Sequence, residues 1–187
     1  MEPATLHAIA NLTARERLLI ASFRGTPMDE SADKVAALAD AVRALDRLGL
    51  AHALVGGVAV GLRSGMPRAT LDTDIAVRST LDVEALGEAF HAVGFQRTGG
   101  FPHSVNFRHR SGERVQIVFD PEFDPMIDRA EPLAVGGTRV CVVTTADLIT
   151  MKERAAADPA RRRSKALRDR ADIELLRGDV PEPDEGW

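Results

Sequence analysis

The sequence has few of the features that mark secreted or membrane proteins. Cys141 is the only cysteine among 187 residues, so no intramolecular disulfide can form, which fits a reducing compartment. No apolar run approaches the roughly 20 residues that a transmembrane helix needs. The first residues also lack a basic segment followed by an apolar core, so no secretory signal is visible. We therefore expect a cytoplasmic protein with no membrane partner.

Several common catalytic and metal-binding motifs are also absent. The chain has no Gly-x-x-x-x-Gly-Lys-Ser/Thr phosphate loop and no Gly-x-Ser-x-Gly nucleophile elbow. The histidines show no spacing typical of metal ligands, and with one cysteine a zinc site is not expected. These absences count against P-loop enzymes, hydrolases with a nucleophile elbow and zinc proteins.

The charge is small overall but uneven along the chain. A formal net charge of −4 argues against a surface that binds nucleic acid throughout. Between Lys152 and Arg170, however, eight residues are basic and three are acidic, and the sign reverses after Arg170. This concentrated basic segment makes phosphate a suitable partner.

Length and composition predict one globular domain with its own core, at 44% hydrophobic and 28% charged residues. Alternating helix-like and strand-like patterns predict an α/β (α+β) fold, a mixed β-sheet flanked by helices. Within it we expect N-terminal helices in residues 1–50 and the core sheet in 51–143. Further helices are expected in 144–178, followed by a flexible tail in 179–187.

Local signals predict the first elements. A capping box at residues 13–16 predicts the start of a short helix, which Gly25 and Pro27 then stop. An apolar stripe over residues 35–48 predicts a second helix, and Gly49 stands where a glycine commonly follows a helix.

Later elements follow from the same rules. The pair Ser79-Thr80 is expected to cap a helix that ends at Gly94, and residues 120–125 are expected to form a turn-rich loop. The pair Gly136-Gly137 predicts a hairpin. Strands are predicted over 96–98, 104–109, 114–119, 132–135 and 139–143, and helices from 144 onward and over 161–176.

Residues 53–77 hold the most informative pattern. Here an apolar run ends on Gly56-Gly57, and a later strand carries Asp72 and Asp74, whose side chains point to the same face. Two crowded carboxylates repel unless a cation lies between them, and Mg²⁺ takes oxygen ligands and shares itself with substrate phosphates. The glycines, at a strand end before a helix, would let backbone N–H groups approach a phosphate. Alone, either motif is usually a solvated strand edge or a turn, but their order and spacing favour a site.

Gly-Gly followed by Arg68-x-Thr70-x-Asp72-x-Asp74 resembles the active-site signature of the DNA polymerase β-like nucleotidyltransferase superfamily. More narrowly, it is similar to the AbiEii-type (abortive-infection toxin) and related minimal nucleotidyltransferases. The resemblance implies that Asp72 and Asp74 are catalytic and hold Mg²⁺. Arg68 would meet phosphate, brace Asp72 or form a structural ion pair. The nucleotide-binding residues expected on this basis are Gly56, Gly57, Ser64, Arg68 and Thr70.

The C-terminal part resembles the closing motifs of the AbiEii-type family. Lys152 matches the family's helix lysine, Asp169 the aspartate of its Arg-Asp pair, and Asp172 its second aspartate. The resemblance implies that Lys152 supplies positive charge to a triphosphate. Asp169 would orient Lys152 or the acceptor hydroxyl, or act as a base. Alternatively these residues are exposed helix charges, which is the usual case for any one of them alone.

One position departs from the superfamily pattern. Gln116 stands on a predicted strand where a third carboxylate is expected, and glutamine neither carries negative charge nor acts as a base. Asp120 shares its strand parity but lies four residues further on, roughly 13 Å at 3.3 Å per residue. Either a different acid serves, or two carboxylates suffice, or the protein has lost activity.

The resemblance implies an enzyme that moves a nucleoside monophosphate from an NTP to a hydroxyl acceptor. That acceptor is an RNA 3′ end, such as that of tRNA, a protein side chain, or a small molecule such as an aminoglycoside. The family further implies the toxin of a bacterial toxin–antitoxin or phage-defence system, with a cognate antitoxin as partner. The alternative is a nucleotide- or partner-binding module of the same fold with little catalysis, for which Gln116 is the main support.

Overall fold

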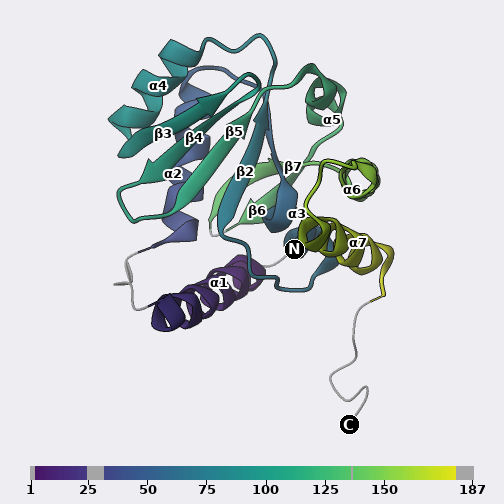
Figure 1. Cartoon of the computed structure of the whole chain (residues 1–187). Helices are drawn as coiled ribbons and strands as arrows, with labels where there is room; N and C mark the ends of the chain where they lie inside the picture. The colour runs from purple at the N-terminus through teal and green to yellow at the C-terminus, as the bar shows by residue number, and fades with distance from the viewer. Residues whose placement is uncertain (1–2, 25–31, 136, 180–187) are drawn as a thin grey trace.

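The computed structural model describes residues 3–24, 32–135 and 137–179 (Figure 1). Within them, seven strands form one sheet in the order β3-β4-β5-β2-β1-β7-β6. The strands are β1 (His52–Val55), β2 (Asp72–Val77), β3 (Phe95–Phe101), β4 (Ser104–His109), β5 (Arg114–Val118), β6 (Glu131–Val135) and β7 (Thr138–Val142). The helical elements are α1 (Pro3–Arg24), α2 (Lys34–Arg47), α3 (Gly56–Ser64), α4 (Val83–Ala92), the short 3-10 helix η1 (Pro121–Phe123), α5 (Asp124–Asp128), α6 (Thr145–Ala157) and α7 (Arg163–Arg177).

The sheet is mixed, as the sequence predicts. β2 lies at its centre, antiparallel to β1 and parallel to β5, and β1 is in turn parallel to β7. The two ends of the sheet are antiparallel pairs, β3–β4 and β6–β7. In Figure 1, α2 lies behind the strands, whereas α6 and α7 lie together beside α3. None of the described helices is long and apolar enough to cross a bilayer.

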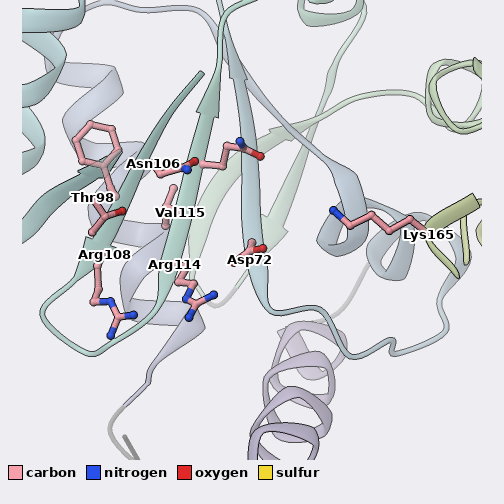
Figure 2. A pocket seen from close by; sticks show the side chains of 9 residues that line it. Asp72, Thr98, Asn106, Arg108, Arg114, Val115 and Lys165 are labelled. Carbon is pink, nitrogen blue, oxygen red and sulfur yellow. The ribbon is translucent and has the colours of Figure 1, made fainter. Parts of the chain in front are cut away.

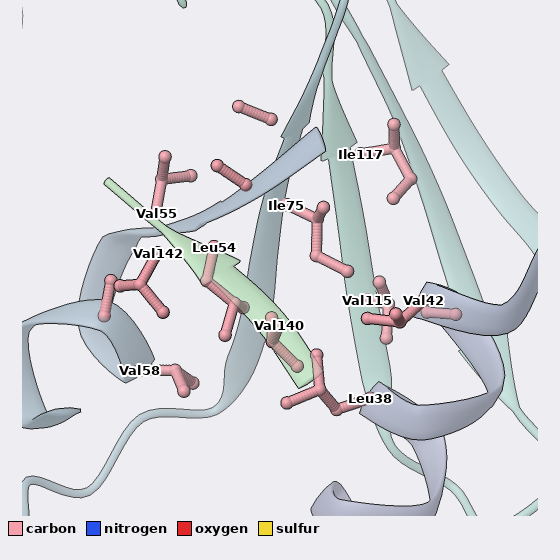
Figure 3. Close-up of a cluster of buried hydrophobic side chains, with 14 of the residues drawn as sticks. Leu38, Val42, Leu54, Val55, Val58, Ile75, Val115, Ile117, Val140 and Val142 are labelled. Atoms are coloured by element: carbon pink, nitrogen blue, oxygen red, sulfur yellow. The ribbon is translucent and has the colours of Figure 1, made fainter. Parts of the chain in front are cut away.

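The core lies between α2 and one face of the sheet. Leu38 and Val42 of α2 lie near Val115 and Ile117 of β5 and Ile75 of β2 (Figure 3), and all five are buried. This is the apolar stripe that the sequence predicts. The same packing sets the two faces of β2, because side chains alternate along a strand. Its odd-numbered residues point into the core, which leaves its even-numbered aspartates on the opposite face.

The predicted capping box at residues 13–16 is wrong. α1 begins at Pro3, so Thr13 lies within the helix and not at its start. The Thr13 hydroxyl donates to the Ile9 carbonyl at 2.8 Å and accepts from the N–H of Thr70 at 3.1 Å. The side chain therefore ties α1 to the loop before β2. Gly25 and Pro27, predicted to stop this helix, lie outside the described residues.

Two further local predictions are corrected. The cap of α4 is Asp82, which accepts from two N–H groups, and not Ser79-Thr80; Ser79 instead donates to Asp124 at 2.7 Å. Residues 120–125, predicted to be a loop, contain η1 and the start of α5. Asp120 accepts from the N–H of Glu122 and precedes a proline at the first helical position, which is a typical helix start.

Other predicted boundaries are close to the observed ones. Gly49 has a positive φ of 64° directly after the α2 cap, and Thr144 caps α6 by accepting from the N–H of Asp147. β6 and β7 form the predicted hairpin, in which Gly137 has a φ of 80°. Gly136 and the last part of the predicted flexible tail, 180–187, lie outside the described residues.

Candidate active site

The junction of β1 and α3 places a helix N-terminus beside the centre of β2. The register pairs Val55, the last residue of β1, with Asp74. The next residue, Gly56, has a φ of +67°, and a Cβ built on it would lie 2.1 Å from Asp74 Oδ2. Only glycine permits both this backbone conformation and so close a carboxylate. Gly56 thus lets α3 begin directly against Asp74.

The first turn of α3 is suited to an anion. Its N-cap residue, Val55, makes no side-chain capping hydrogen bond, so the first N–H groups are not capped from that position. A Cβ on Gly57 would lie 2.4 Å from Arg68 Nη1 and 2.7 Å from Thr70 Oγ1. The absent side chain of Gly57 therefore makes room for Arg68 and Thr70 over the first turn. The helix dipole and the guanidinium together favour negative charge at this place.

Asp72 and Asp74 lie on the face of β2 that points away from the core, Asp72 exposed and Asp74 partly buried. Burial raises the pKa of Asp74 to about 6, and the Asp72 charge adds to the rise, while Lys152, Lys34 and Lys165 partly oppose it. Within the described part of the chain, neither carboxylate has an ion-pair partner. The pair is therefore a site of uncompensated negative charge.

The residues present fit a magnesium ion that is shared with a substrate. No group of three or more His, Cys, Asp or Glu that could hold a metal occurs among the described residues. The two carboxylates of Asp72 and Asp74 form a suitable oxygen donor set, because Mg²⁺ is commonly held by one or two carboxylates together with substrate phosphates.

Gln116 occupies the place where a third carboxylate is expected. The parallel register of β2 and β5 sets it directly beside Asp74. Its amide nitrogen donates to the Ser104 hydroxyl at 3.3 Å, so it takes part in a neutral hydrogen bond. Asp120 does not take its place, because it caps η1. The site therefore has two carboxylates on the sheet.

Lys152 joins the two aspartates of α7. Its Nζ donates to Asp169 Oδ1 at 2.8 Å and forms an ion pair with Asp172 Oδ2, also at 2.8 Å. Asp169 is 2% exposed and Asp172 is 1% exposed. The alternative that these residues are exposed helix charges is therefore wrong for both aspartates. They hold Lys152 in place where α6 meets α7.

Two arginines complete this network. Arg161 donates to Asp169 Oδ2 at 2.7 Å, and Arg68 Nε lies 2.6 Å from Asp172 Oδ1. Arg68 thus pairs with Asp172, not with Asp72. Burial alone would raise the pKa of Asp169, but the hydrogen bonds and charges of Lys152 and Arg161 outweigh it and hold that pKa below its usual value. A carboxylate so neutralised is a weak base, so the geometry favours an orienting role for Asp169.

These groups face one pocket of about 730 Å³. The buried Asp172 does not line it, and of the other predicted site residues the exception is Ser64. Its hydroxyl donates to the Val60 carbonyl at 2.8 Å and accepts from the N–H of Met66 at the far end of α3. The predicted residues that line the pocket are Gly56, Gly57, Arg68, Thr70, Asp72, Asp74, Lys152 and Asp169. Basic residues from the segment before and within α7 form the opposite wall, namely Arg161, Arg162, Lys165 and Arg168.

A second group of charged residues supports β2 from its buried face, and the sequence analysis did not predict it. Lys34 and Glu113 form an ion pair, and both also contact the Thr73 hydroxyl. Arg17 reaches Glu113 at 3.1 Å and the Leu71 carbonyl at 2.8 Å. The start of the strand that carries the two aspartates is thus fixed from behind. The pair spans 79 residues of sequence, so no local pattern indicates it.

Several solved nucleotidyltransferases resemble this chain. The lincosamide antibiotic adenylyltransferase LnuA, bound to lincomycin, has a TM-score of 0.57 at 13% identity, covering 80% of this chain and 99% of that one. ANT(2'')-Ia in complex with adenylyl-2''-tobramycin has a TM-score of 0.56 at 16% identity, covering 79% and 90%. An antigenic nucleotidyltransferase-like protein from Paracoccidioides brasiliensis has a TM-score of 0.53 at 23% identity, covering 82% and 81%. These likenesses confirm the predicted fold.

Sequence comparison gives the family. No curated protein sequence gives a significant match. The family model described as nucleotidyl transferase AbiEii toxin, type IV TA system, matches residues 36–185, which is most of the chain and includes the pocket. The resemblance inferred from the Gly-Gly and Asp-x-Asp motifs is thereby confirmed. The chain belongs to the AbiEii nucleotidyltransferase toxin family, and as an enzyme it is a nucleotidyltransferase.

Proposed function

We propose that this protein transfers a nucleoside monophosphate from an NTP to a hydroxyl acceptor in a Mg²⁺-dependent reaction. One observation carries the proposal. The unpaired carboxylates Asp72 and Asp74, the uncapped N-terminus of α3 and the cation Lys152 all face a single pocket. Negative charge for a metal and positive charge for phosphates are thus placed side by side, as nucleotidyl transfer requires.

Asp72 and Asp74 are the residues that would hold the metal. When bound, Mg²⁺ would neutralise phosphate charge and help align the displacement. The backbone N–H groups at Gly56 and Gly57 would receive phosphate oxygens, with Arg68 above them. Ser64, expected from the sequence to bind nucleotide, has no part in this proposal because it does not line the pocket.

Lys152 would act on the phosphates from the other side. A lysine has three N–H donors, and Lys152 lies 2.8 Å from one carboxylate oxygen each of Asp169 and Asp172. Asp169 and Asp172 thus fix the position of the ammonium group, and its third donor would be directed to a triphosphate. Asp169 is then a positioning residue, and Lys152 is a catalytic one.

The reaction forms one bond and breaks one. The acceptor oxygen bonds to the α-phosphorus, and the bond from that phosphorus to the oxygen bridging the α- and β-phosphates breaks. Pyrophosphate leaves with the electron pair. The hydroxyl proton passes to water, because Gln116 cannot accept it and Asp169 is neutralised by its cations. A loose phosphoryl-type transition state tolerates the lack of a strong base.

We further propose that the protein acts in the cytoplasm as the toxin of a bacterial toxin–antitoxin or phage-defence system, with a cognate antitoxin. The family description supports this role. For the acceptor, the basic wall formed by α7 and the segment before it supports an RNA 3′ end, such as that of tRNA, over a protein side chain or a cationic small molecule.

A second candidate is a nucleotide- or partner-binding module with little catalysis. The position of Gln116 directly beside Asp74 favours it, because a neutral amide stands where a third carboxylate would help hold metal.

A labelling experiment separates the two candidates. The protein is incubated with each α-labelled NTP and Mg²⁺, together with total RNA or protein extract, and the label is followed into macromolecules. Transfer by the wild type that an Asp72→Asn/Asp74→Asn variant abolishes supports the enzyme. NTP binding without transfer from any NTP to any acceptor supports the binding module instead. Unchanged Mg²⁺-dependent NTP affinity in the double variant contradicts the assignment of the metal site.

A further inference from the structure

A smaller pocket of about 390 Å³ adjoins the nucleotide pocket across β2, β5 and β4 (Figure 2). The two pockets share Asp72, Gln116 and Lys165. The strand register places Asp72 beside Arg114 and Arg114 beside Arg108, so one row across the sheet runs from a catalytic carboxylate to two arginines. Whatever occupies this pocket lies next to the reacting groups.

The arginine pair is unusual for a sheet surface. Arg108 and Arg114 are directly opposite each other on antiparallel strands, where like charges are destabilising. Among the described residues neither has an acidic partner, and both are exposed. By contrast, Arg110 on the loop after β4 lies 3.4 Å from Asp40, and Arg97 of β3 lies 4.0 Å from Glu84. Two uncompensated guanidiniums side by side are suited to binding a phosphate through paired hydrogen bonds.

The other lining groups suit a ligand that carries both phosphate and hydroxyl or base atoms. Thr98 and Asn106 add neutral hydrogen-bonding groups on the sheet, and Lys165 extends toward it from α7 (Figure 2). At about 390 Å³ the pocket is near the lower end of ligand sites, so it admits a small part of a larger molecule. A cationic acceptor would be repelled by three basic side chains.

We propose that this pocket, named here the Arg108–Arg114 subsite, binds the phosphodiester backbone at the end of a single RNA strand. The terminal hydroxyl of that strand then lies at Asp72, facing the nucleotide pocket. The inference rests on the proposed nucleotidyl transfer and assigns its acceptor. The phosphates of the NTP have their own partners at the α3 N-terminus and Lys152, so the arginine pair is left for the second substrate.

The test measures RNA binding by fluorescence anisotropy with a labelled 12-nucleotide single-stranded RNA of mixed sequence that has a free 3′ hydroxyl. An Arg108→Gln/Arg114→Gln variant is expected to bind it at least about tenfold more weakly. The slope of log affinity against log salt should also fall in magnitude by about 0.7 for each lost phosphate contact. Arg97→Gln is the matched control, because it removes an exposed arginine of the same sheet that pairs with α4. It should leave both quantities unchanged.

Two readouts exclude a structural explanation. The melting temperature of the double arginine variant should equal or exceed that of the wild type, because a repulsive pair is removed. Its NTP affinity in Mg²⁺ should be unchanged. If the double arginine variant binds RNA as tightly as Arg97→Gln does, the subsite is overturned. The subsite is also overturned if the double variant loses as much affinity for NTP as for RNA, because the arginines would then belong to the nucleotide pocket.

The subsite and the proposed function can fail separately. Transfer of label to protein or to a small molecule, undiminished in the double arginine variant, overturns the RNA subsite but leaves nucleotidyl transfer intact. RNA binding that depends on Arg108 and Arg114, without transfer from any NTP, supports the subsite and contradicts the enzyme. Label in RNA 3′ ends that is lost in the double arginine variant, but not in Arg97→Gln, supports both.

Discussion

The two faces of β2 carry charge in opposite ways. On the buried face, the charges of Lys34 and Glu113 are matched to each other at 2% and 1% exposure. On the open face, Asp72 and Asp74 share one side of the strand and neither has an ion-pair partner among the described residues. The strand is thus fixed by satisfied charges behind it and presents unsatisfied charges in front. Charge that the fold itself leaves uncompensated marks the place where a ligand is expected.

Breaking the buried face should have the largest effect on stability. Glu113→Ala removes the carboxylate shared by Lys34 and Arg17 and leaves a lysine buried without a charged partner. We expect the free energy of unfolding to fall by about 3–5 kcal/mol, measured by urea denaturation. Arg43→Ala removes an exposed arginine from the buried Asp40, which keeps Arg110 and His109 as partners, and should cost less than about 1 kcal/mol.

A compensating variant tests the cause of that loss. Lys34→Met/Glu113→Leu replaces both charges with apolar groups and should recover most of the stability, since a buried pair is often no better than a well-packed apolar one. If Glu113→Ala costs no more than Arg43→Ala, the buried pair does not support β2 as described.

Removing the ammonium group of Lys152, which faces the nucleotide pocket, should have its main effect on catalysis. Lys152→Ala is expected to reduce label transfer by about 10²–10³-fold, comparable to the loss of one donor that stabilises transition-state charge. The melting temperature should also fall, because Asp169 and Asp172 lose a partner, although each keeps an arginine. Transfer unchanged in Lys152→Ala would remove the C-terminal half of the proposed site.

Neutralising the open face should stabilise the protein in the absence of metal. The pKa of Asp74 in the folded protein, about 6, exceeds its ordinary value of 3.8, so the folded protein binds an extra proton and loses stability as pH rises between these values. Asp74→Asn should therefore raise the free energy of unfolding by about 1–3 kcal/mol at pH 8 and by roughly half as much at pH 5.

Thermal melts at both pH values, with and without Mg²⁺, check this expectation. Saturating Mg²⁺ with NTP should stabilise the wild type and not the variant, which reverses their order at pH 8. An equal difference between the two proteins at pH 5 and pH 8 would contradict the role of the Asp74 charge.

Local sequence patterns predicted the open face better than the buried one. The alternation of a strand sets Asp72 and Asp74 on one side whatever surrounds them, and Gly56-Gly57 marks a close approach that only glycine allows. Both signals lie within one short segment. The partners of Lys34 and Arg68 lie far along the chain, so no spacing rule could have found them.

The failed predictions have the same origin. The capping box at residues 13–16 is a genuine local pattern, yet the turns before it pack through Leu6 and Ile9, which are fully buried, and the helix continues through Thr13. Tertiary packing thus overrides the local signal. The Arg108–Arg114 pair was missed for a related reason, since cross-strand neighbours depend on register and not on sequence distance.

The smallest expected effect comes from adding charge to the open face. Gln116→Asp places a third carboxylate on β5 directly beside Asp74 in the strand register. Without metal, the added repulsion should lower the free energy of unfolding by about 1 kcal/mol at pH 8, and Mg²⁺ with NTP should restore it. Label transfer should equal or exceed that of the wild type, because the change adds a metal ligand or a base where the chain has a neutral amide. Gln116→Glu is the control, because it adds the same charge on a side chain that is one methylene longer. Transfer abolished by Gln116→Asp but kept in Gln116→Glu would show that the two-carboxylate site depends on the long side chain at this position.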